Sequence, residues 1–370
     1  MNHVTDRPRA VVSRVSAWLP VSIDRRVRVF AWLSLAIQLL IVLTGGVVRL
    51  TASGLGCPTW PTCTADSLVT TQEMGIHGII EFGNRLLFFV IQIVAIITFL
   101  LVVRFRKERR DLFVLALIPC FSIVLQAVLG GITVLSNLNP YVVGLHFLAS
   151  VVLVVLAAMF VYRVYYGPRG QYFAAPVPFR IVAHVTSLFV FITIILGILT
   201  TGSGPHAGDG GSSRNGLSSE MLQHFHSWPA YAATFGTLAL LVLSARPGMA
   251  RTRRFVVILL AIEVVQVIVG LTQARLGLPE PLVAIHMVLA CALGAVVRTV
   301  SRERRVARAL GRRVEERIAH VQGEGELDHR EGESGQQHAD EHELHRRGAA
   351  IGSQGGRGTR EEPHVALRTR

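Results

Sequence analysis

The sequence predicts an all-α, polytopic membrane protein whose eight transmembrane helices form two parallel four-helix repeats. Composition is the first reason. Of the 370 residues, 51% are hydrophobic and only 16% are charged, and the mean hydropathy is +0.47, which is unusual for a soluble domain. The second reason is that eight apolar runs each approach the ~20 residues needed to cross the hydrocarbon core of a bilayer. The third is a spaced pattern of Gln, Gly and His that occurs once in each half.

The apolar runs are predicted to be helices, because an isolated strand cannot satisfy its backbone polar groups in lipid. The first run follows a basic leader, is closed by Arg49 and has no small-residue cleavage site after it. We therefore expect a membrane span there, and not a signal peptide. The runs lie near residues 30–50, 77–103, 112–135, 142–162, 181–200, 224–244, 255–274 and 282–300.

Basic residues set the predicted topology. They cluster before the first run and after the second, fourth, sixth and eighth, and the other four loops are almost free of them. The positive-inside rule therefore places both termini in the cytoplasm. On this interpretation the net charge of +13 reports topology, with the lipid bilayer and no nucleic acid as partner. The clusters are Arg25, Arg26 and Arg28; Arg104, Arg106, Lys107, Arg109 and Arg110; Arg163, Arg169 and Arg180; Arg246, Arg251, Arg253 and Arg254; and Arg302, Arg304 and Arg305.

Lys107 is the only lysine among the 37 basic residues, which suggests a GC-rich bacterial genome. We accordingly expect the protein in the plasma membrane of a bacterial cell, crossing it several times.

Five regions are expected along the chain. A cytoplasmic N-terminal segment (1–29) precedes the first four-helix half (30–162), and a cytoplasmic linker (163–180) leads to the second half (181–302). Residues 303–370 are polar, Gly-rich and charged in both signs, so they are predicted to be a disordered cytoplasmic tail. Metal binding by the histidines of this tail is possible, but solvated low complexity is the favoured interpretation. They are His320, His329, His338, His342, His345 and His364.

Two stretches 140 residues apart define the repeat. Gln126 is followed by Gly-Gly and, twenty residues on, by His146; Gln266 is followed by a Gly and, twenty residues on, by His286. With four helices in each half, both halves enter the membrane in the same orientation, as in membrane proteins with parallel repeats. Because each histidine lies just inside a new apolar run, the pattern predicts a duplicated ligand site.

Each half also offers a second histidine. His77 opens the second run, and His224 and His226 open the sixth, all in the outer third of the membrane. Two facing helices that each give one imidazole can hold a heme iron or another metal ion from both sides. Polar residues are costly at this depth, which favours a functional role. Taken singly, each histidine could instead cap a helix or bond a carbonyl group, and His184 and His206 are expected to be structural or solvated.

The start of the second run carries unusual chemistry. Glu81 follows His77 by one helical turn. Asn84 and Arg85 come one turn later, and Asn84 shares a face with the other two. A carboxylate beside a histidine on an inward face can relay protons or lie at the edge of a bound macrocycle. The alternative is an ion pair between Glu81 and Arg85 that stabilises the helix, and both interpretations can hold together.

Four motifs can be compared with known families. The first outer loop reads Gly45-Gly46-Val-Val-Arg49-Leu-Thr-x-Ser-Gly54-Leu-Gly56-Cys57-Pro58-x-Trp60-Pro61-x-Cys63. The second run contains Glu81-Phe-Gly-Asn84-Arg85, the sixth contains Gln223-His-Phe-His226, and the Gln…Gly…His pattern ends at His146 and His286. Together these motifs resemble the heme A synthase family over roughly residues 30–300.

The resemblance implies an oxidoreductase that converts heme O to heme A by oxidising a ring methyl group to a formyl group. It implies that one half holds the substrate heme and the other a heme B. Glu81 would be catalytic, His146 would ligate in the first half, and His226 and His286 would ligate in the second. Heme O synthase is a possible supplier of the substrate, the electron donor is unidentified, and a homo-oligomer is left open.

One position departs from the family pattern. Where the family usually has a histidine, this chain has Asn84, and asparagine is a poor iron ligand. His77 lies two turns earlier on the same face, ~10 Å along the helix axis. We expect His77 to replace the missing ligand; otherwise the substrate iron has only His146. His224 points about 200° away from His226, so His226 is the expected ligand of the sixth run.

The outer loop holds two further groups of interest. Cys57 and Cys63 flank two prolines in an oxidising compartment, so we expect a disulfide, which the resemblance also supports. A strained, exposed disulfide could be redox-active, and its role stays open. Arg49 and Arg85 are expected to pair with heme propionates or with Glu81. Cys120 and Cys291 are expected to be small apolar fillers.

Two other functions compete with this one. A two-heme cytochrome b that moves electrons between quinol and an acceptor would use the same histidines. A transporter built from parallel repeats would use them as proton relays, but the lack of Gly/Pro-broken helices at mid-membrane disfavours it. The sequence has no flavin or nicotinamide fingerprint, so electrons are expected from a partner or a membrane carrier.

Overall fold

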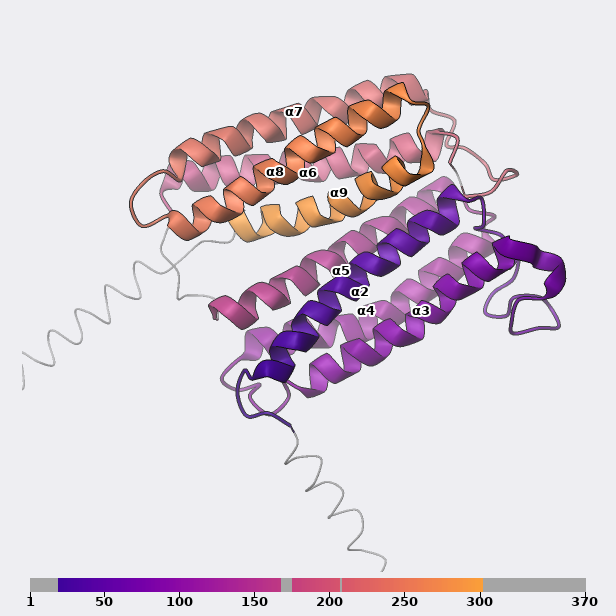
Figure 1. The fold of residues 1–370 in the computed structure, drawn as a ribbon, viewed down its shortest axis with the longest axis horizontal. Coiled ribbons are helices and arrows are strands. Elements are labelled where there is room, and N and C mark those ends of the chain that lie inside the picture. The colour runs from indigo at the N-terminus through magenta and orange to yellow at the C-terminus, as the bar shows by residue number, and fades with distance from the viewer. Residues whose placement is uncertain (1–18, 168–174, 207, 302–370) are drawn as a thin grey trace, which may run out of the picture. The chain divides into compact units, whose positions relative to one another are not determined.

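The computed structural model describes residues 19–167, 175–206 and 208–301. Within these ranges every secondary-structure element is a helix, which confirms the all-α class (Figure 1). The disordered tail and most of the N-terminal segment predicted above lie outside the described residues. The elements are α2 (Arg25–Leu50), a 3-10 turn η1 (Gln72–Met74), α3 (Gly75–Leu100), α4 (Arg110–Leu135), α5 (Pro140–Tyr166), α6 (Val177–Ser203), α7 (Ser219–Leu243), α8 (Ala250–Arg275) and α9 (Glu280–Ser301).

Seven of the eight long helices described are apolar enough to cross a membrane by length and composition. The exception is α7, whose first turns carry Glu220, His224 and His226. It packs along α6 within the same bundle. The described helices also leave large apolar side chains exposed, such as Phe121, Phe235 and Val242. Such faces suit contact with lipid, so the chain is a polytopic membrane protein.

Helix starts are set by local polar groups. The Asp24 side chain accepts the Val27 N–H at 3.0 Å and caps α2. Asn139 caps α5 through the Tyr141 N–H, with Pro140 at the first helical position, where its missing N–H costs nothing. Each cap lies directly before an apolar run.

The repeat extends to the turns that precede the histidine helices. Before α5, Leu138 has a φ of 57° and its N–H donates to the Thr133 carbonyl at 2.8 Å. Before α9, Leu278 has a φ of 63° and its N–H donates to the Gln273 carbonyl, also at 2.8 Å. These pairs are 140 residues apart, as are the histidines. The same closing bond in a left-handed turn therefore ends α4 and α8, the helices that precede the two histidine helices.

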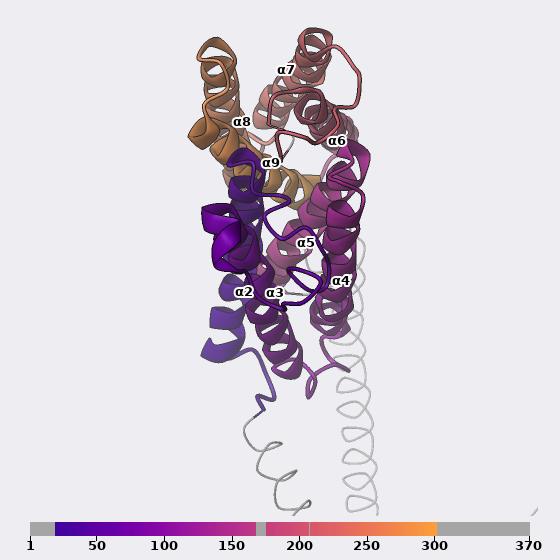
Figure 2. The same cartoon turned by 90° about the vertical axis from the view of Figure 1, so that its right-hand side faces the viewer.

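The two halves run in the same direction. Arg49 in the last turn of α2 donates to the Thr201 carbonyl near the end of α6 at 3.1 Å, and the Gly54 N–H donates to the Gly208 carbonyl at 2.9 Å. The C-terminal ends of α2 and α6 therefore meet at one end of the bundle, which Figure 2 faces. This arrangement confirms parallel repeats and excludes a head-to-foot arrangement of the two halves.

Four helices join the halves. In the first half α2 and α5 pack against each other, and both contact α9; α6 contacts α5 and α9 (Figure 1). One hydrophobic core crosses this boundary, with Val151 and Val154 of α5 beside Val190 of α6 and Leu293 of α9. The second helix of each half, α3 or α7, lies away from the boundary, so each four-helix unit keeps its own interior.

Candidate functional site

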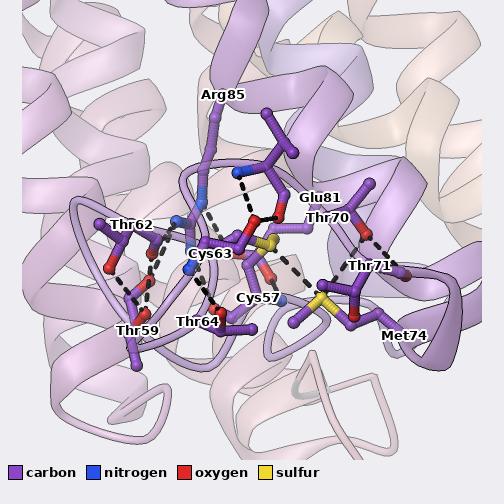
Figure 3. The surroundings of a disulfide bond; sticks show 12 residues. Cys57, Thr59, Thr62, Cys63, Thr64, Thr70, Thr71, Met74, Glu81 and Arg85 are labelled. Atoms are coloured by element: carbon purple, nitrogen blue, oxygen red, sulfur yellow. Dashed lines mark hydrogen bonds and ion pairs between the residues drawn. A yellow bond between two sulfur atoms is a disulfide. The ribbon is translucent and has the colours of Figure 1, made fainter.

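A buried carboxylate lies near the start of α3, the second helix of the first half. Glu81, in the second turn of α3, is 5% exposed. Its Oε2 accepts the Cys57 N–H at 2.6 Å, and its Oε1 forms an ion pair with Arg85 one turn later (Figure 3). The predicted pair between these two side chains is confirmed. Both oxygens of Glu81 are thus held, and its position is fixed from two directions.

Arg85 ties the outer loop to α3. Its guanidinium donates to the carbonyl groups of Cys57 at 2.9 Å, Thr59 at 3.0 Å and Thr62 at 3.2 Å. Two further N–H groups face Glu81 (Figure 3). A guanidinium has five N–H donors, so all of them are used here. Of the two partners expected for Arg85, the structure shows Glu81 and leaves no donor for a propionate.

The loop contains the expected disulfide. Cys57 and Cys63 are bonded, with their Cα atoms 4.5 Å apart, and both residues are completely buried. The Cys63 sulfur also lies 3.4 Å from the Met74 sulfur (Figure 3). The disulfide is therefore not an exposed one, which was the condition that favoured redox activity.

The same loop packs onto α4 beside a predicted ligand. A Cβ atom on Gly131 would overlap the Trp60 indole ring, so only glycine lets the loop approach so closely. A Cβ atom on the preceding Gly130 would lie 3.4 Å from the His146 Cε1 atom. Trp60 and His146 therefore lie against consecutive residues of α4. The loop that contains Cys57, Trp60 and Cys63 therefore covers this end of the first half.

The repeated Gln–His pattern has a common geometry. The Gln126 amide donates to the His146 backbone carbonyl at 3.1 Å, and the Gln266 amide donates to the His286 carbonyl at 3.2 Å. A Cβ atom on Gly130 or on Gly270 would lie 3.4 Å from the facing histidine ring in either half. The glutamines thus fix the helix backbone and leave both imidazoles uncommitted. The Nδ1 atoms of both rings are buried without a hydrogen-bond partner.

In the second half two imidazoles face each other. The ring centroids of His226 and His286 are 6.1 Å apart, with an angle of 69° between the planes. The His226 Nδ1–H donates to the Thr193 carbonyl at 2.9 Å, which leaves its Nε2 lone pair free for a ligand bond. A Cβ atom on Gly197 would lie 2.9 Å from this ring, so α6 carries glycine there.

The first half is built differently at the matching position. Asn84 of α3 replaces the histidine, and its side-chain oxygen accepts from the Thr44 hydroxyl at 2.7 Å. His77 is exposed at the first turn of α3, and its Nδ1 lies 2.9 Å from the Ser53 hydroxyl. Among the described residues, His146 has no ring contact with another histidine of the kind seen for His286.

Arg49 joins the end of α2 to the loop that follows α6. Its Nε donates to the His206 carbonyl at 2.7 Å, in addition to its bond with Thr201. The His206 ring in turn donates to the Leu278 carbonyl at 2.9 Å, so this histidine is structural, as expected. The exposed His224 shares no such contact among the described residues. The sequence did not reveal Thr44 and Thr193 as partners, since neither belongs to a quoted motif, and it predicted no contact for Trp60 of the loop motif.

Fold and site together define a polytopic membrane protein with a duplicated four-helix unit that presents imidazoles at one end. The family described as cytochrome oxidase assembly protein matches residues 28–208. Proteins named heme A synthase are similar to this chain in Listeria welshimeri (26% identity; 46% of this chain, 57% of the relative) and Lysinibacillus sphaericus (32% identity; 38% of this chain, 47% of the relative). Residues 28–208 therefore resemble this family, and the similarity to the proteins named heme A synthase covers less than half of this chain. The matched segments span about half the length of these curated relatives.

Arg85→Lys tests the attachment of the loop. Lysine keeps the charge beside Glu81 but cannot reach three separate carbonyl groups. We expect the Cys57–Cys63 disulfide to be reduced roughly tenfold faster, because each lost charged hydrogen bond is worth about 1.5–3 kcal/mol. Timed reduction with a mild thiol, followed by alkylation, measures this. Arg275→Lys, at an exposed arginine in the last turn of α8, should leave the rate unchanged; equal rates in both variants would contradict the role given to Arg85.

Proposed function

We propose that this protein is a heme A synthase, which oxidises a methyl group of heme O to the formyl group of heme A for terminal oxidases. The observation that carries the proposal is Glu81. It is a buried carboxylate fixed by Arg85 and by the disulfide loop, beside the helices that present His146. Polar groups buried at this depth are costly, and a structure that fixes one so completely favours chemistry there.

The second half suits a resident heme B. The 6.1 Å between the rings of His226 and His286 corresponds to a metal–nitrogen bond of about 2 Å on each side, plus the half-width of each ring. The Thr193 carbonyl fixes the tautomer of His226, and Gln266 fixes the backbone at His286. A bound heme would supply one-electron transfer, and these residues orient and retain it.

The first half is proposed to hold the substrate, heme O, with His146 as one ligand. We propose His77 as the second, because Ser53 can fix its Nδ1 and so leave Nε2 for the iron, as Thr193 does for His226. The Asn84–Thr44 pair supplies no ligand of this kind. If His77 does not bind, the substrate iron keeps only His146 and an open position.

Glu81 is proposed to accept or donate a proton at the reacting edge of the substrate. The backbone N–H of Cys57 and the guanidinium of Arg85 stabilise its charged form. Arg49 is the proposed partner of a propionate, because its bonds to the carbonyl groups of His206 and Thr201 leave further N–H donors at the boundary of the halves. The loop that bears Trp60 excludes water from this end.

Several features of the wider setting belong to the same proposal. The basic clusters at the inner ends of the helices support cytoplasmic termini and a bacterial plasma membrane. Heme O is proposed to arrive from heme O synthase. Electrons are proposed to come from a donor outside the chain, because the sequence has no flavin or nicotinamide fingerprint. A homo-oligomer is compatible with the exposed apolar helix faces.

The second candidate function is a two-heme cytochrome b. The paired imidazoles of His226 and His286 favour it, because such a pair suits electron transfer alone. Expression in a host that supplies heme O, followed by chromatography and mass analysis of the extracted hemes, separates the two. Heme A in the extract supports the synthase; heme B alone, with heme O unconverted in the membranes, supports the cytochrome.

Glu81→Gln tests the catalytic role in that host. Glutamine keeps the size of the side chain but cannot carry the proton, so heme A output should fall by roughly 100-fold or more while heme stays bound. The matched control is Glu73→Gln, at an exposed carboxylate of η1 near the same loop, which should convert normally. Normal heme A output from Glu81→Gln would remove this residue from the mechanism.

His286→Ala tests the second-half site. We expect it to lose the heme B that His226 alone cannot retain, which heme quantification and the visible spectrum of the purified protein measure. His224→Ala removes an exposed imidazole two residues from His226 and should keep a full complement. Unchanged heme content in His286→Ala would refute the ligand assignment.

His77→Ala decides the ligand question in the first half. If His77 ligates, conversion falls, and adding Asn84→His in the same chain restores it, because the family's ligand position is then refilled. Heme A output and the spectrum of the bound substrate heme report both effects. Full activity of His77→Ala alone would show that this histidine is no ligand.

A further inference from the structure

The second half contains a buried carboxylate of its own. Glu263, in the middle of α8, is 4% exposed. Its Oε1 accepts from the Thr237 hydroxyl of α7 at 2.8 Å, and its Oε2 is buried without a hydrogen-bond partner. Among the described residues no basic side chain forms an ion pair with it. An unpaired charge in the bilayer interior is strongly unfavourable, so the ionised form of this group needs a compensating positive charge nearby.

Glu263 lies two helical turns, ~10 Å along α8, from Gly270, the residue that faces the His286 ring. It precedes Gln266 by three residues on the same face of α8, and Gln266 holds the backbone carbonyl of His286. Among the described residues its hydrogen-bond partner is Thr237 of α7, the helix that carries His226. The carboxyl group therefore lies one turn deeper than the glutamine, between the helices that supply the two imidazoles.

The fold itself does not require a carboxyl group here. Glu263 of α8 corresponds to Ile123 of α4, 140 residues earlier. Thr237 corresponds to Ala95 of α3, because each follows the matched position, His226 or Asn84, by eleven residues. Both are buried and belong to one hydrophobic cluster of the first half. An apolar pair thus packs the same place in the matching unit, and only the second half carries the polar pair.

A second unpaired polar atom lies nearby. Thr186 of α6 is completely buried, its hydroxyl oxygen has no hydrogen-bond partner, and it lies against Gly236, next to Thr237. Each unsatisfied buried group costs about 1–3 kcal/mol. The unpaired oxygens of Thr186 and Glu263 both belong to residues that contact the Gly236–Thr237 segment of α7. Packing alone does not explain two unsatisfied polar groups there, which favours a functional role.

The titratable groups on the elements around Glu263 lie elsewhere along the helices. Most are near the helix ends, and the interior ones besides the two ligands are a tyrosine and a thiol. They are Glu220, His224, His226 and Tyr231 on α7, Glu280, His286, Cys291 and Arg298 on α9, and Arg251, Arg253, Arg254 and Arg275 on α8 itself. Glu263 is thus the interior carboxyl group of this half.

We propose that Glu263 is the proton-binding group of the second half. It takes up one proton from water when one electron enters the heme site of His226 and His286, and it releases that proton when the electron leaves. An external one-electron reductant supplies the electron, and the carboxylate becomes the neutral acid, so the charge of the interior is unchanged. The inference rests on the proposed function, because it requires a redox group in the second half.

Redox titration of the purified, heme-loaded chain between about pH 5 and 9 tests it. The midpoint potential of the second-half heme should fall as the pH rises, because proton uptake accompanies reduction. Glu263→Gln keeps the bond to Thr237 but cannot titrate, so this slope should disappear. The matched control, Glu280→Gln, neutralises an exposed carboxylate in the first turn of α9 and should keep the slope.

The possible outcomes are distinct. A slope that persists unchanged in Glu263→Gln, or a wild-type midpoint that does not vary with pH, overturns the role of Glu263 while heme binding stands. Wild-type protein that binds no heme through His226 and His286 overturns the proposed function, and this inference with it. Loss of the slope in Glu263→Gln alone supports the proposal.

Discussion

The rest of the site depends on Arg85. All five of its N–H groups donate to acceptors in α3 and in the disulfide loop. Arg85 neutralises Glu81 and at the same time satisfies three carbonyl groups of the disulfide loop. A buried carboxylate without that partner would be several kcal/mol too costly to keep charged. The same bonds hold the loop over the end of the bundle, where Trp60 packs against Gly131. The hydrogen bonds of one side chain, Arg85, therefore both neutralise Glu81 and hold the loop over the site.

Duplication gave both halves the same way of presenting a histidine. A left-handed turn ends the helix before α5 and α9, a glutamine from that preceding helix holds the carbonyl of His146 or His286, and a glycine leaves room for the ring. The halves diverge on the second helix, where His226 faces its partner ring but Asn84 bonds Thr44. The two halves thus share the backbone geometry around His146 and His286 but differ in the residue at the second position. This difference supports the proposal that one half retains a heme and the other exchanges a substrate.

The carboxylates are distributed as unevenly as the ligands. Glu81 is near the outer end of the first half with both oxygens bonded, whereas Glu263 is deep in the second half with one oxygen unpaired. Hydrogen-bond donors surround the first carboxylate, whereas the second keeps one oxygen where a proton can bind. A proton acceptor near the proposed substrate and a proton-binding group near the proposed electron site would keep the interior close to neutral during turnover.

The sequence by itself determined the all-helical class, the parallel repeat, the disulfide and the Glu81–Arg85 pair. Apolar length, arginine placement and i,i+4 spacing are local properties, and local backbone geometry follows from them. It did not show that the glutamines bond backbone carbonyls, that Thr44 and Thr193 contact the second helix of each half, or that Glu263 is buried against Thr237. Those contacts join residues on different helices, and their side-chain directions depend on how the helices rotate against one another. Only the packed structure decides that rotation, because many apolar faces of similar hydrophobicity could have formed the interior.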